Sequence, residues 1–200
     1  MNTIGSVAEL EALYDDVVPG AVTKVRAELT PLYQKWIRAS RFVILTTVGP
    51  EGTDASPRGD DGPVVRIVDS TTLWLPDWRG NNRLDSLRNI VVDGRVSLMF
   101  MVPGSDNVVR INGTAALTTD EEITGSFLKG NKTPRSVVVI HAEETYFQCA
   151  KALMRSKLWQ VPAEKPDVPT AGAFVKEGDA AFDADAYDSG YAEYAKPRMW

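Results

Sequence analysis

The stretch Leu73 to Asn112, LWLPDWRGNNRLDSLRNIVVDGRVSLMFMVPGSDNVVRIN, decides the fold of this 200-residue chain. Its apolar runs and turn residues predict a strand, a polar turn, a short helix and two further strands joined by a hairpin. The segment 80–87 in its centre places small polar residues and Arg83 where the helix begins. Because the first backbone N–H groups of a helix have no partner inside the helix, a phosphate group fits this place.

Short strands flank this stretch on both sides. The turn residues PGSDN at 103–107 separate two apolar runs and predict the hairpin. Further turn clusters at 49–52 and 59–63 separate runs rich in β-branched residues. The expected strands cover residues 41–48, 53–58, 64–68, 72–76, 95–102, 108–117 and 136–142, the last of which is apolar and therefore central. Short strands with tight turns predict an antiparallel sheet or barrel rather than βαβ units.

Apolar residues at helical spacing predict helices between and around these strands. Ser6 is the expected N-cap of the first helix, and Pro31 is a candidate start of a second helix within the apolar pattern of residues 21–39. The expected helices cover residues 7–14, 21–39, 85–92, 119–128 and 146–155. The two N-terminal helices are expected to lie across the sheet. Residues 1–162 then form one domain, and residues 163–200, rich in Pro, Asp and Ala, form an extended arm or tail.

Composition limits the classes of function. A net charge of −5 argues against a general nucleic-acid surface, which needs clustered basic residues. No apolar run approaches the roughly 18 residues that span a bilayer, so a cytoplasmic protein without membrane contact is expected. With Cys149 and His141 as the sole residues of their types, we expect no disulfide and no metal site. Both side chains are interpreted as structural, with Cys149 buried in a helix.

Several segments taken together resemble the pyridoxamine 5′-phosphate oxidase-like, FMN-binding split-barrel family. The most specific part is their order, which is a strand, a basic polar turn, a short helix with an "RVSL-F" strand, and a following "VRI-G" strand. The segments are SPRGD at 56–60, LPD at 75–77, GNNRLDSLRNI at 80–90, GRVSLMF at 94–100 and VRING at 109–113. The resemblance covers residues 41–159.

This resemblance implies a mixed α+β, mainly β fold: a six-stranded antiparallel split β-barrel with flanking helices. It also implies a homodimer that holds two FMN molecules in clefts between the subunits. At the phosphate end, Arg83 with Asn82 and Ser86 offers a charged donor, a polar turn and a hydroxyl group. The family usually carries adjacent basic residues here, whereas this chain has Arg79, Arg83 and Arg88 spaced apart.

Other residues are implied at the ring end of the flavin. The strand residues Val64, Val65, Arg66 and Ile67 would supply main-chain groups along the ring, with the Arg66 side chain near its polar edge. Arg58 would serve the phosphate or the substrate. The remaining cofactor-binding candidates are Trp78, Trp159 and Arg110. The alternative role for the two tryptophans is in the core or the dimer interface, and the alternative for Arg110 is an ion pair with Asp85 or Asp93.

The resemblance favours an FMN flavoprotein, an oxidoreductase that passes a hydride between a small organic substrate and the flavin. The substrate stays open, and no acid–base pair stands out as catalytic. The arginine- and tryptophan-containing C-terminal signature of the authentic oxidase is not recognisable. Two alternatives remain: an F420-dependent reductase of the same fold, and a flavin-binding carrier or sensor without turnover.

Overall fold

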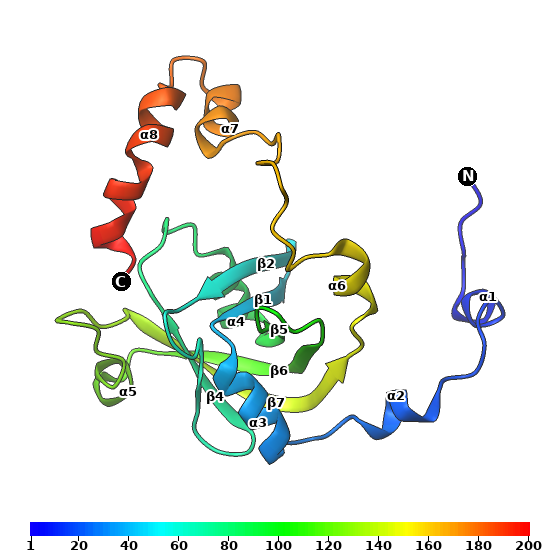
Figure 1. Cartoon of the computed structure of the whole chain (residues 1–200). Coiled ribbons are helices and arrows are strands. Elements are labelled where there is room, and N and C mark those ends of the chain that lie inside the picture. The colour runs from blue at the N-terminus through cyan, green and yellow to red at the C-terminus, as the bar shows by residue number, and fades with distance from the viewer.

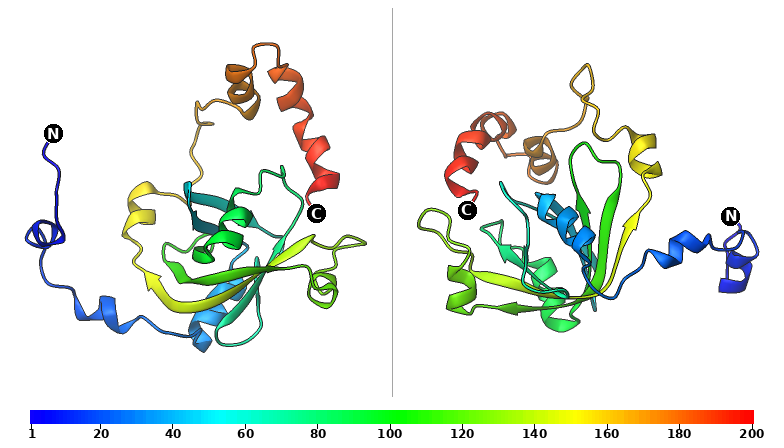
Figure 2. Two further views of the ribbon diagram at one scale, coloured as in Figure 1. Left: turned by 180° about the vertical axis from the view of Figure 1, so that it is seen from behind. Right: turned by 60° about the horizontal axis from the view of Figure 1, so that its bottom comes forward.

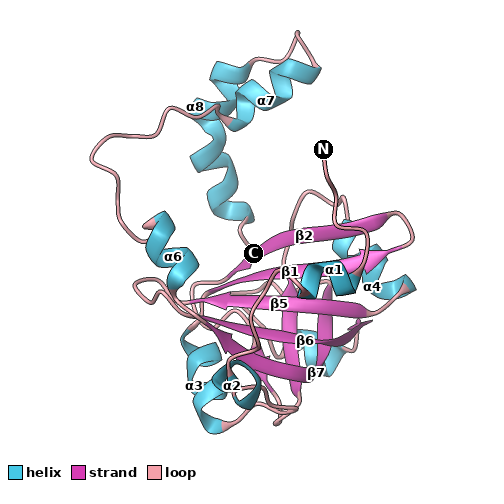
Figure 3. Ribbon diagram, turned by 90° about the vertical axis from the view of Figure 1, so that its right-hand side faces the viewer, coloured by secondary structure: helices cyan, strands magenta, loops and turns pink.

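The computed structural model describes all 200 residues and is built on one antiparallel sheet. Seven strands follow the order β2-β1-β5-β6-β7-β4-β3, and the sheet curls on itself (Figures 1 and 3). The strands are β1 (Phe42–Gly49), β2 (Gly52–Gly59), β3 (Arg66–Ile67), β4 (Thr72–Asp77), β5 (Arg95–Met101), β6 (Val108–Thr118) and β7 (Ser136–Gln148). The predicted mixed α+β fold with a mainly antiparallel sheet is therefore confirmed.

Some helices flank the sheet, and others lie in the segments before its first strand and after its last strand. They are α1 (Val7–Glu11), α2 (Pro19–Thr23), α3 (Pro31–Ala39), α4 (Asp85–Val92), α5 (Glu121–Gly125), α6 (Lys151–Ser156), α7 (Ala171–Gly178), α8 (Ala184–Ala195) and the 3₁₀ helix η1 (Lys196–Arg198). Ser6 caps α1 as expected, and Pro31 occupies the first turn of α3. None of these helices has the length and apolar character needed to cross a bilayer.

Alternation of buried and accessible side chains explains the strands. Along β1, Val43 and Leu45 are fully buried, while their neighbours Ile44 and Thr46 are half-buried on the other face. The same alternation buries Leu98 and Phe100 on β5. Burying one such side chain contributes about 1.5–3 kcal/mol, so the inward face of the sheet supplies most of the core.

A bulge bends the longest pair of strands. The register between β6 and β7 shifts between Asn112 and Gly113. A Cβ atom at Gly113 would lie 2.0 Å from the backbone oxygen of His141, so the strands approach more closely there than any larger residue allows. Bulges increase local twist, and Figure 2 shows β7 curving around the barrel.

One ion pair brings the far ends of the sheet together, and two backbone hydrogen bonds hold the segment that follows β2. The Arg58 Nη1 atom on β2 lies 2.6 Å from Asp77 Oδ1 at the end of β4, although four strands separate β2 from β4 in the sheet. The N–H groups of Asp60 and Val64 donate to the backbone oxygens of Arg41 and Ser40. These bonds join the segment after β2 to the segment before β1, where the candidate site lies.

Both chain ends reach beyond the barrel. Residues 1–23 lead away from it and carry α1 and α2, which bury no residue, whereas the backbone of Arg26 already pairs with Thr145 of β7 (Figure 1). At the other end, α7 and α8 form a helical hairpin that rises above the barrel and turns back, so that the C-terminus lies near the loop after β4 (Figure 2).

Several sequence expectations need correction. The structure has the seven strands that the residue patterns predict, and the six strands implied by the family resemblance do not count the two-residue β3. Residues 146–148 continue β7 beside β6, so the helix expected at 146–155 begins only at Lys151. Cys149 is consequently exposed between β7 and α6 and not buried in a helix. Within residues 21–39, the helix expected to open at Pro31 is present as α3, and α2 is a separate short helix before it. The region 163–200, expected as an extended arm or tail, contains α7 and α8.

Candidate functional site

Three adjoining cavities form one cleft along the seam where β2 meets the end of β4. The first has a volume of about 260 Å³ and lies at the N-terminus of α4. The second, of about 230 Å³, shares Pro57, Arg58 and Gly80 with the first. The third, of about 450 Å³, shares Asp60, Pro76 and Trp78 with the second. We name them the α4 cavity, the middle cavity and the α5 cavity, since residues next to α5 line the last of them.

The turn between β4 and α4 gives the α4 cavity its backbone donors. Asn82 and Leu84 have positive φ angles of 61° and 64°, so the chain makes a tight irregular loop before the helix. Leu84 is the N-cap residue, and no side chain caps the helix. The first N–H groups of α4 therefore lack intrahelical partners beside the cavity that Leu84, Asp85, Ser86 and Leu87 line.

A directional chain of hydrogen bonds crosses the floor of the α4 cavity. The Arg58 Nε–H donates to Ser56 Oγ at 3.2 Å, and Ser56 Oγ lies 2.9 Å from Ser86 Oγ. The Ser86 hydroxyl, on a residue only 3% exposed, donates to Asp54 Oδ2. A serine hydroxyl has one proton to donate, so Ser56 must be the donor to Ser86. Both hydroxyl protons are engaged in this arrangement.

Two arginines stand beside the α4 cavity, each next to a carboxylate. Arg58 is largely buried and pairs with Asp77. Arg83 pairs with Asp85 at 2.8 Å but leaves 76% of its side chain exposed. Because a guanidinium group carries five N–H donors, each arginine keeps donors for a further anion without breaking its pair.

Carboxylates outnumber arginines around the α4 cavity. The lining includes Asp54, Asp77 and Asp85 against Arg58 and Arg83. The helix N-terminus adds about half a positive charge. Asp77 and Asp85 are each compensated by an arginine, so Asp54 is the carboxylate without a cationic partner among these pairs.

The α5 cavity has a more aromatic lining with mixed charges. The Trp78 Nε1–H donates to Asp60 Oδ2 at 3.2 Å, and the Lys129 ammonium group binds the carboxylates of Asp60 and Asp61. Burial alone would lower the pKa of Lys129, but these carboxylates outweigh burial and raise that pKa above its ordinary value. Lys129 therefore stays charged at neutral pH.

Arg66 is fixed at the edge of the same cavity. Its Nη2 group donates to the backbone oxygen of Ser126 at 2.8 Å, and the guanidinium group lies 4.1 Å from the centre of the Phe127 ring. Both contacts come from the segment after α5. Arg66 and Lys129 thus place two cationic side chains on the wall of the α5 cavity.

The cleft brings together most of the residues that the sequence singled out. Val64 and Val65 are core residues, 2% and 3% exposed, whose atoms nevertheless line the middle and α5 cavities. The Val64 N–H donates to the Ser40 oxygen at 2.9 Å and is not available to a ligand. The residues along the cleft are Arg58, Val64, Val65, Arg66, Ile67, Trp78, Asn82, Arg83 and Ser86.

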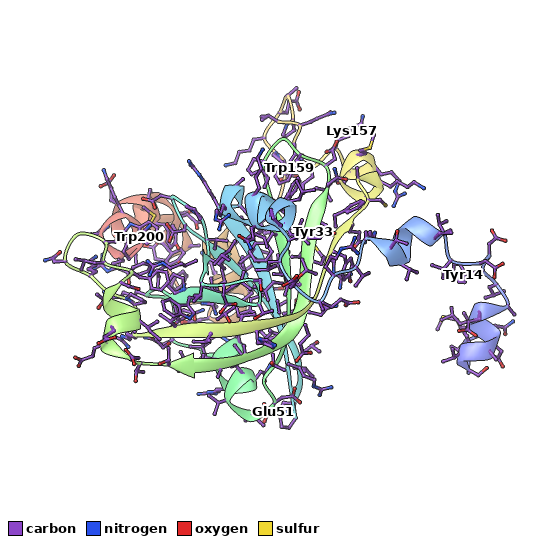
Figure 4. All side chains as sticks on the ribbon, turned by 90° about the horizontal axis from the view of Figure 1, so that it is seen from below. Tyr14, Tyr33, Glu51, Lys157, Trp159 and Trp200 are labelled. Atoms are coloured by element: carbon purple, nitrogen blue, oxygen red, sulfur yellow. The ribbon has the colours of Figure 1, made fainter.

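Arg110 and Trp159 lie outside this cleft. The Arg110 guanidinium group donates to Gln148 Oε1 at 3.2 Å and stacks on Tyr146, so the expected pairing with Asp85 or Asp93 is wrong. Trp159 donates to the backbone oxygen of Ser105 at 2.7 Å in the β5–β6 hairpin. Figure 4 shows Trp159 far from Trp200, which lies near α5.

Sequence reasoning missed several residues of the cleft. Asp54 and Ser56 alternate with Arg58 along β2 and are half-buried on the same face, a period-two pattern that was readable in the sequence. Lys129 gave no such signal, because it reaches Asp60 across 69 positions of the chain. Trp200 gave none either, since it follows a region expected to be a tail.

Comparison with known proteins identifies the family. The family model described as pyridoxamine 5′-phosphate oxidase matches residues 29–149, more than half of the chain. Among curated protein sequences, no match is found.

Two solved structures are similar to part of this chain. HupZ from Group A Streptococcus is 20% identical, with a TM-score of 0.48 over 58% of this chain and 90% of that one. A candidate pyridoxamine 5′-phosphate oxidase from Lactobacillus delbrueckii is 22% identical, with a TM-score of 0.49 over 60% of this chain and 95% of that one. From the match to the family model, this chain belongs to the pyridoxamine 5′-phosphate oxidase family.

Proposed function

We propose that this protein binds FMN along the three cavities, with the phosphate in the α4 cavity and the ring toward the α5 cavity. Proteins of this family typically bind a flavin. The observation that carries the proposal is the uncapped N-terminus of α4, which stands beside Ser86, Arg58 and Arg83. Helix N–H groups, hydroxyls and guanidinium groups are the donors that a phosphate dianion requires.

The residues present fit a phosphate, provided that one hydroxyl turns. The Ser86 hydroxyl donates to Asp54 and would instead donate to a phosphate oxygen. Arg58 can keep its bonds to Asp77 and Ser56 while its remaining N–H groups face the anion. Arg83 is the more exposed of the two arginines and would close the site from the solvent side.

The lining of the α5 cavity suits the ring end of a flavin. Arg66 and Lys129 offer positive charge to the polar edge of the ring, and Trp78 offers an apolar surface. When bound, the flavin would supply the redox centre that accepts or gives a hydride. The protein would orient the substrate and exclude water. We infer an FMN-dependent oxidoreductase of this family acting on a small organic substrate.

The deazaflavin F420, whose acidic tail is longer than the FMN phosphate, fits this chain less well than FMN does. A cavity of about 460 Å³ continues from the α4 cavity past Arg83 and Arg88. Its lining also includes Glu51, Asp54 and Asp85, which would repel further carboxylates. This charge distribution favours FMN over the deazaflavin F420.

We also propose that the active form is a homodimer with FMN at the subunit interface, as is common in the family. The N-terminal arm supports a second copy of the chain as a partner. Between residues 4 and 22 of this arm, the large apolar side chains are all exposed, namely Ile4, Val7, Leu10, Leu13, Tyr14, Val17, Val18 and Val22. A second subunit would remove this apolar surface from water. Light scattering on the full chain should give the mass of two copies, and a monomer that binds FMN would contradict this part of the proposal.

The proposed function is tested by the colour and chemistry of the purified protein. The full chain should carry or take up FMN, with a flavin absorption spectrum and FMN released on denaturation. Bleaching of that spectrum by NADH or NADPH, followed by its return with an electron acceptor, would support an oxidoreductase. Binding without any bleaching across a panel of donors and acceptors would favour a flavin carrier or sensor. No binding of FMN or F420 would overturn the proposal.

A further inference from the structure

The last two residues of the chain lie against the candidate cleft. Met199 lines the middle cavity together with Arg58, Arg79 and Gly80. Trp200 packs edge-to-face on Trp78, with 5.4 Å between the ring centres. Trp78 lines both the middle and the α5 cavities, so the C-terminus sits at the passage between them.

Cationic side chains hold this C-terminal tip in place. The Lys129 ammonium group lies 3.6 Å from the centre of the Trp200 ring, within the range of a cation–π contact. Lys132 donates to the backbone oxygen of Pro197 at 2.7 Å. Lys129 simultaneously binds Asp60 and Asp61 in the wall of the α5 cavity, so Trp200 is attached to the cleft itself.

The rest of the C-terminal region is held mainly by its own contacts. The helices α7 and α8 pack on each other, with the Gly172 N–H donating to Asp188 Oδ1 at 2.9 Å. Residues 157–170 contain no helix or strand and connect this hairpin to the barrel. The contacts between the hairpin and the cleft therefore come from its C-terminal tip, Met199 and Trp200.

We propose that Met199 and Trp200 form the outer wall of the flavin cleft where the middle cavity meets the α5 cavity, and that they limit the access of solvent and substrate there. This inference rests on the proposed FMN site. Its consequence is that the chain's own C-terminus determines the size of molecule that reaches the ring. Trp200 would also lie close enough to the flavin to quench its fluorescence.

The test compares the full chain with Trp200→Ala and with a chain that ends at Arg198. Trp159→Phe is the matched control, because Trp159 binds Ser105 outside the cleft. With FMN bound, both C-terminal variants should show brighter flavin emission and severalfold stronger quenching by acrylamide. The control should match the full chain. Equal acrylamide quenching in the full chain and both C-terminal variants would overturn the inference.

A second readout does not need the flavin. In the cofactor-free protein, acetylation of Lys129 should be severalfold faster in Trp200→Ala than in the full chain, relative to the exposed Lys151 on α6. Faster acetylation together with unchanged acrylamide quenching would mean that Trp200 covers Lys129 but not the ring, which overturns the inference. An unchanged acetylation rate in Trp200→Ala would contradict the contact between Trp200 and Lys129. If the full chain binds no flavin, the proposed function is wrong. The proposed wall of the flavin cleft is then wrong as well, whatever the rate of acetylation.

Discussion

Arg58 and Asp77 join two strands that the sheet order keeps apart. The 2.6 Å contact between Arg58 Nη1 and Asp77 Oδ1 links β2, at one edge of the sheet, to the end of β4 near the other edge. Both side chains are largely buried, so the pair is better shielded from water than an ordinary surface ion pair. The same contact orients Arg58 toward the α4 cavity, and fold closure and anion binding therefore depend on one pair.

Asp77→Asn should weaken both stability and FMN binding. The charge-assisted bond becomes neutral, which we expect to lower the free energy of unfolding by about 1–2 kcal/mol. Arg58 also loses its orientation, so the dissociation constant for FMN should rise. Chemical denaturation and FMN titration measure the two effects. Asp93→Asn is the matched control, since Asp93 pairs with Arg95 at 2.6 Å outside the cleft. An equal loss of FMN binding in both variants would refute a specific role for Asp77.

Asp54→Asn should strengthen FMN binding. Asp54 accepts the Ser86 hydroxyl and brings an uncompensated negative charge near the proposed phosphate. Removing that charge should lower the dissociation constant for FMN. The dissociation constant for riboflavin should stay unchanged, because riboflavin has no phosphate. Titration with both ligands measures the difference. Weaker FMN binding in Asp54→Asn would mean that Asp54 supports the site instead of competing with the phosphate.

Gly113→Ala should destabilise the barrel. A Cβ atom there would lie 2.0 Å from the backbone oxygen of His141, so β6 or β7 must shift. Overpacking of this kind costs roughly 1–3 kcal/mol, measurable by chemical denaturation. Gly190→Ala is the control, because nothing lies within 4 Å of a Cβ atom at that position in α8. Equal stability of the two variants would contradict the close approach of β6 and β7.

Stability should fall in acid partly through the turn between β3 and β4. The Asp69 carboxylate accepts the Thr71 and Thr72 N–H groups at 2.7 Å, and these bonds lower the pKa of Asp69 below its ordinary value of 3.8. Because the pKa of Asp69 is lower in the folded than in the unfolded chain, its ionised form stabilises the fold at any pH above the unfolded pKa. This contribution is lost as the pH falls through the folded pKa. Urea midpoints of the parent chain should therefore drop below about pH 4. Asp69→Asn should start lower and drop less, and parallel pH profiles would contradict this assignment.

Much of the fold could be read from the sequence because local patterns dominate there. The alternation along β1 and β5 and the polar turn before α4 are signals within a few residues, and the structure has these elements where they were expected. The end of β7 was misjudged because Tyr146 and Phe147 suit a helix as well as a strand. Their pairing with β6 decides in favour of the strand, and pairing across the chain leaves no local signal.

The candidate site was predictable to the same extent. The residues near α4 share one short stretch, so the turn chemistry around Arg83 and Ser86 was enough to predict that they lie together. Lys129 and Trp200 reach the cleft only through tertiary folding, and their sequence neighbours carry no recognisable motif. The position of Arg110 outside the cleft could not be predicted, because the pattern of a single strand does not reveal which face of the sheet borders a cleft.

Binding of FMN and riboflavin by the full chain tests the account most directly. We expect FMN to bind at least about tenfold more tightly than riboflavin, because charge-assisted contacts to the phosphate contribute about 1.5–3 kcal/mol. Arg83→Ala should reduce this preference, whereas Arg88→Ala should preserve it, since Arg88 does not line the α4 cavity. Equal dissociation constants for FMN and riboflavin in the full chain would contradict a phosphate site at the N-terminus of α4.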